Sequence, residues 1–217
     1  TLTPNAKIAI PHANLFDDSS SQFRQSMRND SSVDPWLDSA IKTVGSYRRM
    51  IDASVCQLSD SALATRPNPE SHSVSILLRH LGGNLKSRWT DFRTSDGEKP
   101  TRDRDNEFKD WTGGREALTE YFDAGWQCMT NAFDEIGQMD PSEEILIRGE
   151  PHRLSDAVWR SVTHISYHTG QIVMIARWVH DGEWRWLTIP PGGSSNHNQQ
   201  TWGSSRSRSV FGEDREV

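Results

Sequence analysis

The sequence predicts an all-α protein built from four long helices. Four stretches, at about 35–58, 73–92, 115–136 and 155–180, repeat apolar residues at the three- and four-residue spacing of one helix face. A long charged connection without such periodicity joins the second stretch to the third. Antiparallel neighbours in a bundle are usually joined by short loops, so this length predicts a crossover between the second and third helices. Before the fourth stretch, E-I-L-I-R-G-E-P-H-R-L predicts a small hairpin about a Gly-Glu-Pro turn.

Residues at the ends of these stretches support them as helices. Asp34 followed by Pro35 is typical of an N-cap and a first helical position. Ser73 can cap the second helix, and Ser155 is predicted to open the fourth. Gly182 is expected to end that last helix, because glycine is common just beyond a helix C-terminus.

The length of 217 residues favours one domain with appended arms. Residues 1–33 are polar and aperiodic and predict an N-terminal arm, 34–182 hold the helical domain, and 183–217 form an irregular C-terminal tail. The first half of the tail carries four large apolar residues, Trp184, Trp186, Leu187 and Ile189. These side chains need a surface to cover, so we expect at least part of the tail to pack on the helices.

Composition argues against several classes of partner. A formal net charge of −6 and a pI near 5.7, without a long Lys/Arg cluster, disfavour nucleic acid. No run approaches the roughly 18–20 apolar residues of a membrane span, and the first residues lack the features of a signal peptide. Cys56 and Cys128 fall within helical patterns, which predicts packing roles and favours a reducing cytoplasm over a disulfide framework. The alternating R-D-R-D run at 102–105 predicts local charge pairs on a solvated face.

Three histidines are the candidate metal ligands. His164 and His168 stand four residues apart in a helical stretch, which places both imidazoles on one face with Cβ atoms roughly 5–6 Å apart. His80 lies in another apolar helical segment and could supply a third nitrogen. Three imidazoles leave coordination positions open for water or substrate, whereas structural zinc sites are closed by four protein ligands. The alternative is that each histidine is a hydrogen-bonded core residue, because a single pair at this spacing is a weak signal.

Two amides are the candidate catalytic residues beside these histidines. Asn84 lies one turn beyond His80, and Gln171 lies three residues after His168. Both are predicted to face the metal cavity, where they would orient a ligand imidazole, the nucleophile or the substrate. The alternative is a pair of buried amides that satisfy a helix end or a neighbouring side chain. Tyr167 directly precedes a ligand and is expected to turn sideways into a helix interface.

These residues carry a resemblance to a known superfamily. The segments S-V-S-I-L-L-R-H-L-G-G-N-L-K-S-R-W, D-G-E-K-P-T-R-D-R-D-N-E-F, H-I-S-Y-H-T-G-Q-I and W-L-T-I-P-P-G resemble the DinB/YfiT-like metal-dependent enzymes, in their largely uncharacterised branch. The resemblance covers about residues 35–200. It implies a four-helix bundle of up-down-down-up order, frequent homodimers, and kinship with isomerases and S-transferases that use bacillithiol, mycothiol or glutathione. By position, His80 matches the ligand of the family's second helix, and His164 and His168 match the H-x-x-x-H pair of its last helix.

Two classes of function follow. In the first, the protein is a hydrolase or thiol S-transferase whose divalent ion lowers the pKa of a water or a low-molecular-weight thiol that attacks a small-molecule substrate. In the second, it is a non-enzymatic metal-binding or stress-response module. The sequence has no G-x-S-x-G, no phosphate-binding glycine loop, no C-x-x-C and no convincing general base beside the histidines. Zinc or nickel is the favoured metal, with iron and manganese as alternatives.

Overall fold

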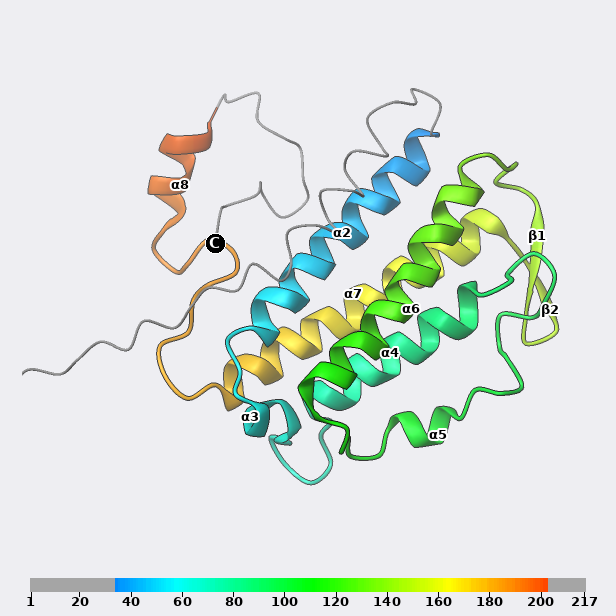
Figure 1. Cartoon of the computed structure of the whole chain (residues 1–217). Helices are drawn as coiled ribbons and strands as arrows, with labels where there is room; N and C mark the ends of the chain where they lie inside the picture. The colour runs from blue at the N-terminus through cyan, green and yellow to red at the C-terminus, as the bar shows by residue number, and fades with distance from the viewer. Residues whose placement is uncertain (1–33, 203–217) are drawn as a thin grey trace, which may run out of the picture. The chain divides into compact units, whose positions relative to one another are not determined.

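The computed structural model describes residues 34–202, which form a mostly helical protein with one two-stranded sheet (Figure 1). The elements are α2 (Pro35–Val55), α3 (Asp60–Ala64), α4 (Val74–Trp89), α5 (Arg104–Glu107), α6 (Gly114–Ile136), β1 (Glu144–Ile147), β2 (Glu150–Arg153), α7 (Leu154–Val179) and α8 (Ser194–Thr201). The mostly helical class predicted from the sequence is confirmed. The predicted arm at 1–33 and the end of the predicted tail, 203–217, lie outside the described residues.

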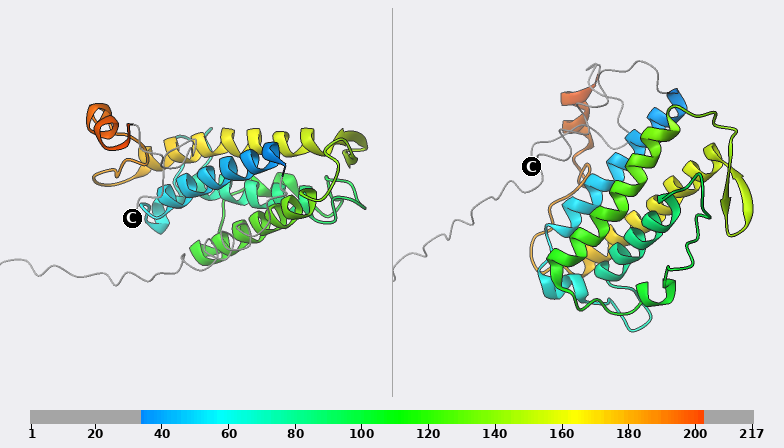
Figure 2. Two further views of the ribbon diagram at one scale, coloured as in Figure 1. Left: turned by 90° about the horizontal axis from the view of Figure 1, so that it is seen from above. Right: turned by 45° about the vertical axis from the view of Figure 1, so that its right-hand side comes forward.

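The four long helices α2, α4, α6 and α7 correspond to the four periodic stretches of the sequence. Helix α4 packs along α6, α2 packs along α7, and α4 also contacts α7. Figures 1 and 2 show that α4 and α6 run in one direction while α2 and α7 run in the other. The apolar face of each helix is turned toward the others, and the largest fully buried side chains include Leu37, Ile51, Leu77, Leu81, Leu118, Met129, Phe133 and Leu154. Burial of these faces is the main force that holds the helices together.

Two glycines let α4 and α6 approach closely. A Cβ atom at Gly125 of α6 would collide with the backbone carbonyl of Gly82 on α4. A Cβ atom at Gly82 would in turn lie 3.0 Å from the backbone of α6. Gly82 therefore allows the two parallel helices to pack closely.

The predicted helix starts were right for two helices and wrong for one. Asp34 caps α2 by accepting a hydrogen bond from the Trp36 amide, and Ser73 caps α4 by accepting one from Ile76. Helix α7 begins at Leu154, before the predicted Ser155, and has no side-chain cap. Strand β2 runs directly into this helix, and the Leu154 amide is satisfied by the Glu143 carbonyl instead. Helix α4 ends at Trp89, three residues before the predicted end.

The predicted hairpin is present, with its turn one residue earlier than expected. Strands β1 and β2 pair antiparallel, with Ile147 opposite Glu150. Arg148 and Gly149 form the turn, and both have positive φ, as a two-residue hairpin turn requires. Asp96 of the crossover accepts hydrogen bonds from both turn amides at 2.8 and 2.6 Å, so the crossover is fastened to the hairpin.

The segments predicted to be irregular contain short helices. Helix α3 follows α2, α5 lies within the crossover against α4, and α8 lies within the predicted irregular tail. Arg185 and Gln57 join the start of the tail to the end of α2 through two hydrogen bonds of 2.8 and 3.2 Å. Packing of the rest of the tail stays a prediction.

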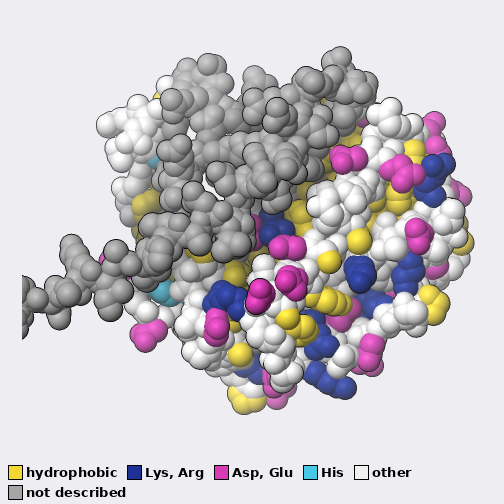
Figure 3. Space-filling model, in the orientation of Figure 1, with side chains coloured by type: hydrophobic (Ala, Val, Ile, Leu, Met, Phe, Trp, Pro, Cys, Tyr) yellow, Lys and Arg dark blue, Asp and Glu magenta, His cyan; other side chains and the backbone are white. Residues whose placement is uncertain are grey.

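Charge on the surface is mixed. Figure 3 shows basic and acidic side chains interspersed with apolar ones over the face turned to the viewer. Of the helices between residues 34 and 202, none is both long and apolar enough to cross a membrane.

Candidate metal centre

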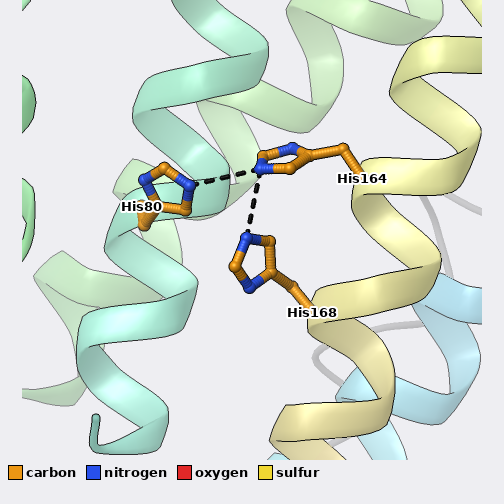
Figure 4. Close-up of side chains that lie close together, drawn as sticks. All are labelled: His80, His164 and His168. Atoms are coloured by element: carbon orange, nitrogen blue, oxygen red, sulfur yellow. Dashed lines mark hydrogen bonds between the residues drawn. The ribbon is translucent and has the colours of Figure 1, made fainter.

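Two neighbouring helices bring the three predicted histidines together. His80 comes from α4, and His164 and His168 come from consecutive turns of α7 (Figure 4). The Nε2 atom of His164 lies 3.2 Å from Nε2 of His80 and 3.1 Å from Nε2 of His168. Over the described range 34–202, these three side chains form the group that could hold a metal ion, with all ligand atoms within 4.8 Å of one another.

These distances fit a divalent ion. Ligand bonds of about 2.0–2.1 Å, at angles between octahedral and tetrahedral, require ligand nitrogens about 2.9–3.4 Å apart. Two of the three Nε2 pairs already meet this requirement. The ligand atoms of the remaining pair, His80 and His168, lie within 4.8 Å of each other.

Glu107 orients the His80 ring from behind. It lies in α5, is 3% exposed, and its Oε2 atom is 2.9 Å from Nδ1 of His80. Arg102 donates to both carboxylate oxygens of Glu107 at 2.8 Å. Burial by itself would raise the pKa of Glu107, but the hydrogen bonds from His80 and Arg102 lower it below its usual value, so the group is ionised. An ionised acceptor keeps the proton of His80 on Nδ1 and leaves Nε2 free to bind a metal.

Gly83 makes room for this carboxylate. A Cβ atom at position 83 would collide with Oε1 of Glu107. Sequence reasoning missed Glu107, and it placed Arg102 on a solvated face. That placement is wrong, because the Arg102 side chain is 5% exposed and pairs with Glu98 as well as Glu107. The signal that could have found them is the Gly-Gly pair directly after His80, which leaves one flank of α4 open to another side chain.

Gln171 plays the corresponding part behind His168. Its Oε1 atom lies 2.7 Å from Nδ1 of His168, and its Nε2 atom donates to the Tyr167 hydroxyl at 3.3 Å. The amide oxygen can only accept, so it also keeps the His168 proton on Nδ1. Tyr167 is 64% exposed and lines the pocket, so the expectation that it turns into a helix interface is wrong.

His164 is the least satisfied of the three rings. Its Nδ1 atom is buried and has no hydrogen-bond partner in the described part of the chain. With the protons of His80 and His168 held on Nδ1, three Nε2 atoms converge and at most one of them carries a hydrogen. A cation that accepts all three lone pairs resolves this crowding.

Both histidines of α7 are neutral at pH 7. Burial, followed by the neighbouring imidazoles, lowers the pKa of His164 to about 3. Burial and His80 lower the pKa of His168 to about 4, against an opposing effect of the Gln171 hydrogen bond. Metal ligation needs unprotonated imidazole, so the lone pairs are available over the physiological range.

A solvent-open pocket of about 380 Å³ lies beside the cluster. Its wall is polar and consists of His80, Asn84, Arg88, Arg102, Arg104, Arg148, Arg160, Ser161, Thr163, His164 and Tyr167. Asn84 thus lies on the wall, whereas Gln171 contacts His168 and is not a wall residue. Neither cysteine reaches the pocket. Cys56 and Cys128 are both free, and Cys56 is exposed at the end of α2, which corrects its predicted packing role.

Comparison with known proteins gives a family without an assigned activity. No curated protein and no solved structure matches the sequence. The family described as "Protein of unknown function (DUF1572)" matches residues 31–193, about three quarters of the chain. The matched range contains α2 through α7 and all three histidines. The chain therefore belongs to the DUF1572 family.

Proposed function

We propose that this protein is a metal-dependent enzyme in which His80, His164 and His168 hold one divalent ion and leave its remaining positions open to the pocket. The convergence of their three Nε2 atoms carries the proposal. Two of the rings are held from behind by Glu107 and Gln171, the usual arrangement for metal-binding imidazoles. Histidines that serve only packing would each direct Nε2 at a separate partner, whereas Nε2 of His164 faces Nε2 of both other rings.

The reaction class is hydrolysis or thiol S-transfer. When bound, a divalent ion lowers the pKa of a water or thiol, so that the nucleophile exists near neutral pH. Asn84 lies on the pocket wall one turn from His80, where its amide can orient the nucleophile or the substrate. Gln171 acts through His168 as a positioning residue. Both cysteines are free and away from the pocket, which supports a reducing, cytoplasmic setting and a thiol supplied by a second small molecule.

The helix arrangement supports kinship with the DinB/YfiT-like superfamily. The direction of the helices, the long crossover between α4 and α6, and the H-x-x-x-H pair on α7 all agree with a DinB-like four-helix bundle of up-down-down-up order. An all-imidazole ligand set suits zinc, nickel or iron better than manganese, which prefers oxygen ligands. We therefore propose zinc or nickel as the resident ion.

The test combines metal analysis with an activity panel on the full chain purified without a histidine tag. We expect about one equivalent of a divalent ion and turnover of at least one member of a panel of thiols with electrophiles, esters and amides. His164→Gln should lose both the ion and the turnover. His152→Gln, which alters a histidine of β2 outside the pocket, is the matched control and should keep both. Equal turnover in the parent and His164→Gln would refute the proposal.

A non-enzymatic metal-binding or stress-response module is the second candidate. One observation favours it: within the described part of the chain no carboxylate lines the pocket, and Glu107 is engaged by His80 and Arg102. The wall therefore has no evident general base other than the histidines. A protein that binds its ion stoichiometrically but turns over no member of the panel would belong to this class.

We also propose that the protein forms a homodimer. Helix α7 carries a line of exposed large apolar side chains, Trp159, Tyr167, Met174 and Trp178. Exposed apolar surface of this kind is typical of contact surfaces, and two-fold dimers are the most common oligomers. Sedimentation should give twice the chain mass at micromolar concentration, and Trp178→Ser should shift the mass toward the monomer. A monomer mass for the parent would exclude the dimer.

A further inference from the structure

The pocket beside the three histidines is lined by several arginine side chains. Five arginines lie on its wall, Arg88, Arg102, Arg104, Arg148 and Arg160, and no acidic side chain from residues 34–202 does. The chain as a whole carries a formal charge of −6, and the face seen in Figure 3 mixes both signs. A pocket with one sign of charge concentrates ligands of the opposite sign.

Two of the five arginines form ion pairs with glutamate side chains that do not line the pocket. Arg102 pairs with Glu98 and Glu107, and Arg148 pairs with Glu98 at 3.2 Å. Their charges are therefore largely neutralised. Neither glutamate is within ion-pair distance of Arg88, although the charge of Glu98 still acts on it.

Arg88 is buried without a partner. It is 5% exposed, and Nη1 of its guanidinium is buried without a hydrogen-bond partner among residues 34–202. A Cβ atom at Gly97 would lie 2.8 Å from Arg88 Nη1, so the crossover leaves space for the guanidinium without satisfying it. Burial, and next the charge of Arg160, lower the pKa of Arg88 to about 10. A buried cation without a partner is costly, and an anion in the pocket would remove this cost.

Arg88 and Arg160 are aligned with the ligand histidines. On α4, His80 and Arg88 are two four-residue steps apart, and on α7, Arg160 lies one such step before His164. The two helices run in opposite directions, so both arginines lie on the same side of the histidine cluster. Each step of four residues advances about 6 Å along a helix. The arginine end is thus about 6–12 Å along the helices from the histidines.

Ser161 adds a hydroxyl to this end of the pocket. Its Oγ atom accepts a hydrogen bond from Trp89 Nε1 at 3.1 Å, and the residue is 4% exposed. The hydroxyl hydrogen has no acceptor among the described residues and can be donated to a ligand. Ser161 and Arg160 both line the pocket.

We propose that Arg88, Arg160 and Ser161 bind the carboxylate or phosphate group of a small anionic substrate, whose reacting end then lies at the three histidines. The forked guanidinium matches the oxygens of these two groups. A pocket of about 380 Å³ accommodates a small molecule. The placement of the reacting end rests on the proposed function, whereas binding of the anionic group does not.

Anion binding to the metal-free chain tests the arginine end by itself. Full-length protein treated with EDTA is titrated calorimetrically with inorganic phosphate, with acetate, and with acetamide as the neutral match to acetate, all at constant ionic strength. We expect saturable binding of phosphate or acetate and none of acetamide. Arg160→Gln, at an exposed position that should not impair folding, is expected to weaken binding at least tenfold, because a hydrogen bond to a charged group is worth about 1.5–3 kcal/mol. Arg88→Lys keeps the buried charge without the fork and should also weaken binding.

Arg177→Gln is the matched control. Arg177 lies on the same helix, 17 residues from Arg160 or about 25 Å along the axis, and faces Trp186 outside the pocket. It should bind anions as the parent does. Equal affinity in the parent and Arg160→Gln, an equal loss in Arg177→Gln, or no saturable binding of either anion would overturn the proposal.

Metal content separates this proposal from the proposed function. Zinc stoichiometry is measured on the same proteins, and Arg160→Gln should bind zinc like the parent. Anion binding that depends on Arg160 in a chain that binds neither zinc nor nickel would support the anion site and refute the metal enzyme. Zinc binding without anion binding would support the metal site and refute the anion site.

Discussion

Two polar clusters lie between the long helices, and they differ in whether their groups are satisfied. In the first, Arg48 of α2 donates to Asp52 at 2.8 and 2.9 Å and to Asp123 of α6 at 2.6 Å. Its guanidinium also lies over the rings of Phe122 and Trp126. In the second, between α4 and α7, Nδ1 of His164 and Nη1 of Arg88 have no hydrogen-bond partner in the described chain.

The difference separates a structural cluster from a binding cluster. Buried polar groups in folded proteins almost always find partners, so a group left without one requires an explanation. Around Arg48 the guanidinium donates to both carboxylates, Asp52 through Nε and Asp123 through Nη2, which is sufficient to join two helices. In the second cluster His164 and Arg88 are pocket residues, and both the converging Nε2 atoms and the unpaired Nη1 atom of Arg88 support our proposal that ligands bind there.

The largest expected effect is the loss of metal from His164→Gln. His164 is the only ring whose Nε2 atom lies within 3.2 Å of both other ligand atoms, so its removal leaves two nitrogens without a shared centre. Metal content should fall from about one equivalent to background by elemental analysis. Asp123→Asn alters the other cluster and should keep the full equivalent. Metal retained by His164→Gln would mean that the ion binds elsewhere.

Glu107→Gln should weaken the site without abolishing it. The amide keeps the size of the side chain but loses the charge that holds the His80 proton on Nδ1. Loss of such a supporting group typically lowers metal affinity about 10–100-fold. Competition with a chromogenic chelator measures the change. Gly83→Ala, which forces the same carboxylate away, should give a similar loss, and unchanged affinity in both variants would contradict the role assigned to Glu107.

His164 and His168 could be predicted from the sequence because a spacing of four places both on one helix face, whereas His80 also required that its helix pack beside theirs. Glu107 could not, because it belongs to an aperiodic crossover whose position depends on tertiary contacts such as that between Asp96 and the hairpin turn. Arg88 and Arg160 were not predicted, although the sequence contains a signal for them. Both stand at multiples of four residues from a ligand histidine, so the same spacing rule would have placed them beside the site.

The helix boundaries also divide into those set by local contacts, which the sequence reveals, and those set by distant ones. Asp34 and Ser73 act through local hydrogen bonds, which sequence reveals. The start of α7 is set instead by a strand that pairs with β1 and continues into the helix, and the carbonyl that satisfies Leu154 is eleven residues away. Local preferences cannot show such a partner, so Ser155 was a reasonable but wrong choice.

The metal-free histidine cluster should also make folding sensitive to pH. The pKa values of His164 and His168 in the folded chain, about 3 and about 4, lie below the ordinary value of 6.5. The unfolded chain therefore takes up protons first as the pH falls. Stability should be fully present above about pH 6.5 and should decrease from there toward pH 4. Thermal unfolding of EDTA-treated protein measures this decrease, and the double variant His164→Gln, His168→Gln should show a smaller one. An equal slope in both proteins would assign the effect to other groups.

The smallest expected effect is that of a substitution in the cluster of Arg48, Asp52 and Asp123. Arg48→Met keeps the apolar stem but removes the guanidinium, which is 20% exposed and joins α2 to α6. Asp52 and Asp123 are 43% and 45% exposed, so water can solvate them once the cation is gone. The expected loss is therefore about 1–2 kcal/mol of unfolding free energy, above a surface pair and below a fully buried one. Chemical denaturation measures this loss.

Metal and anion affinities should remain those of the parent in Arg48→Met, because Arg48 contacts none of the pocket residues. A variant that loses stability and keeps both ligands would establish that the two clusters act independently. If Arg48→Met instead lowered metal affinity as Glu107→Gln does, the cluster between α2 and α6 would have to position the histidines through the packing of α2 on α7. The distinction between a structural and a binding cluster would then not hold.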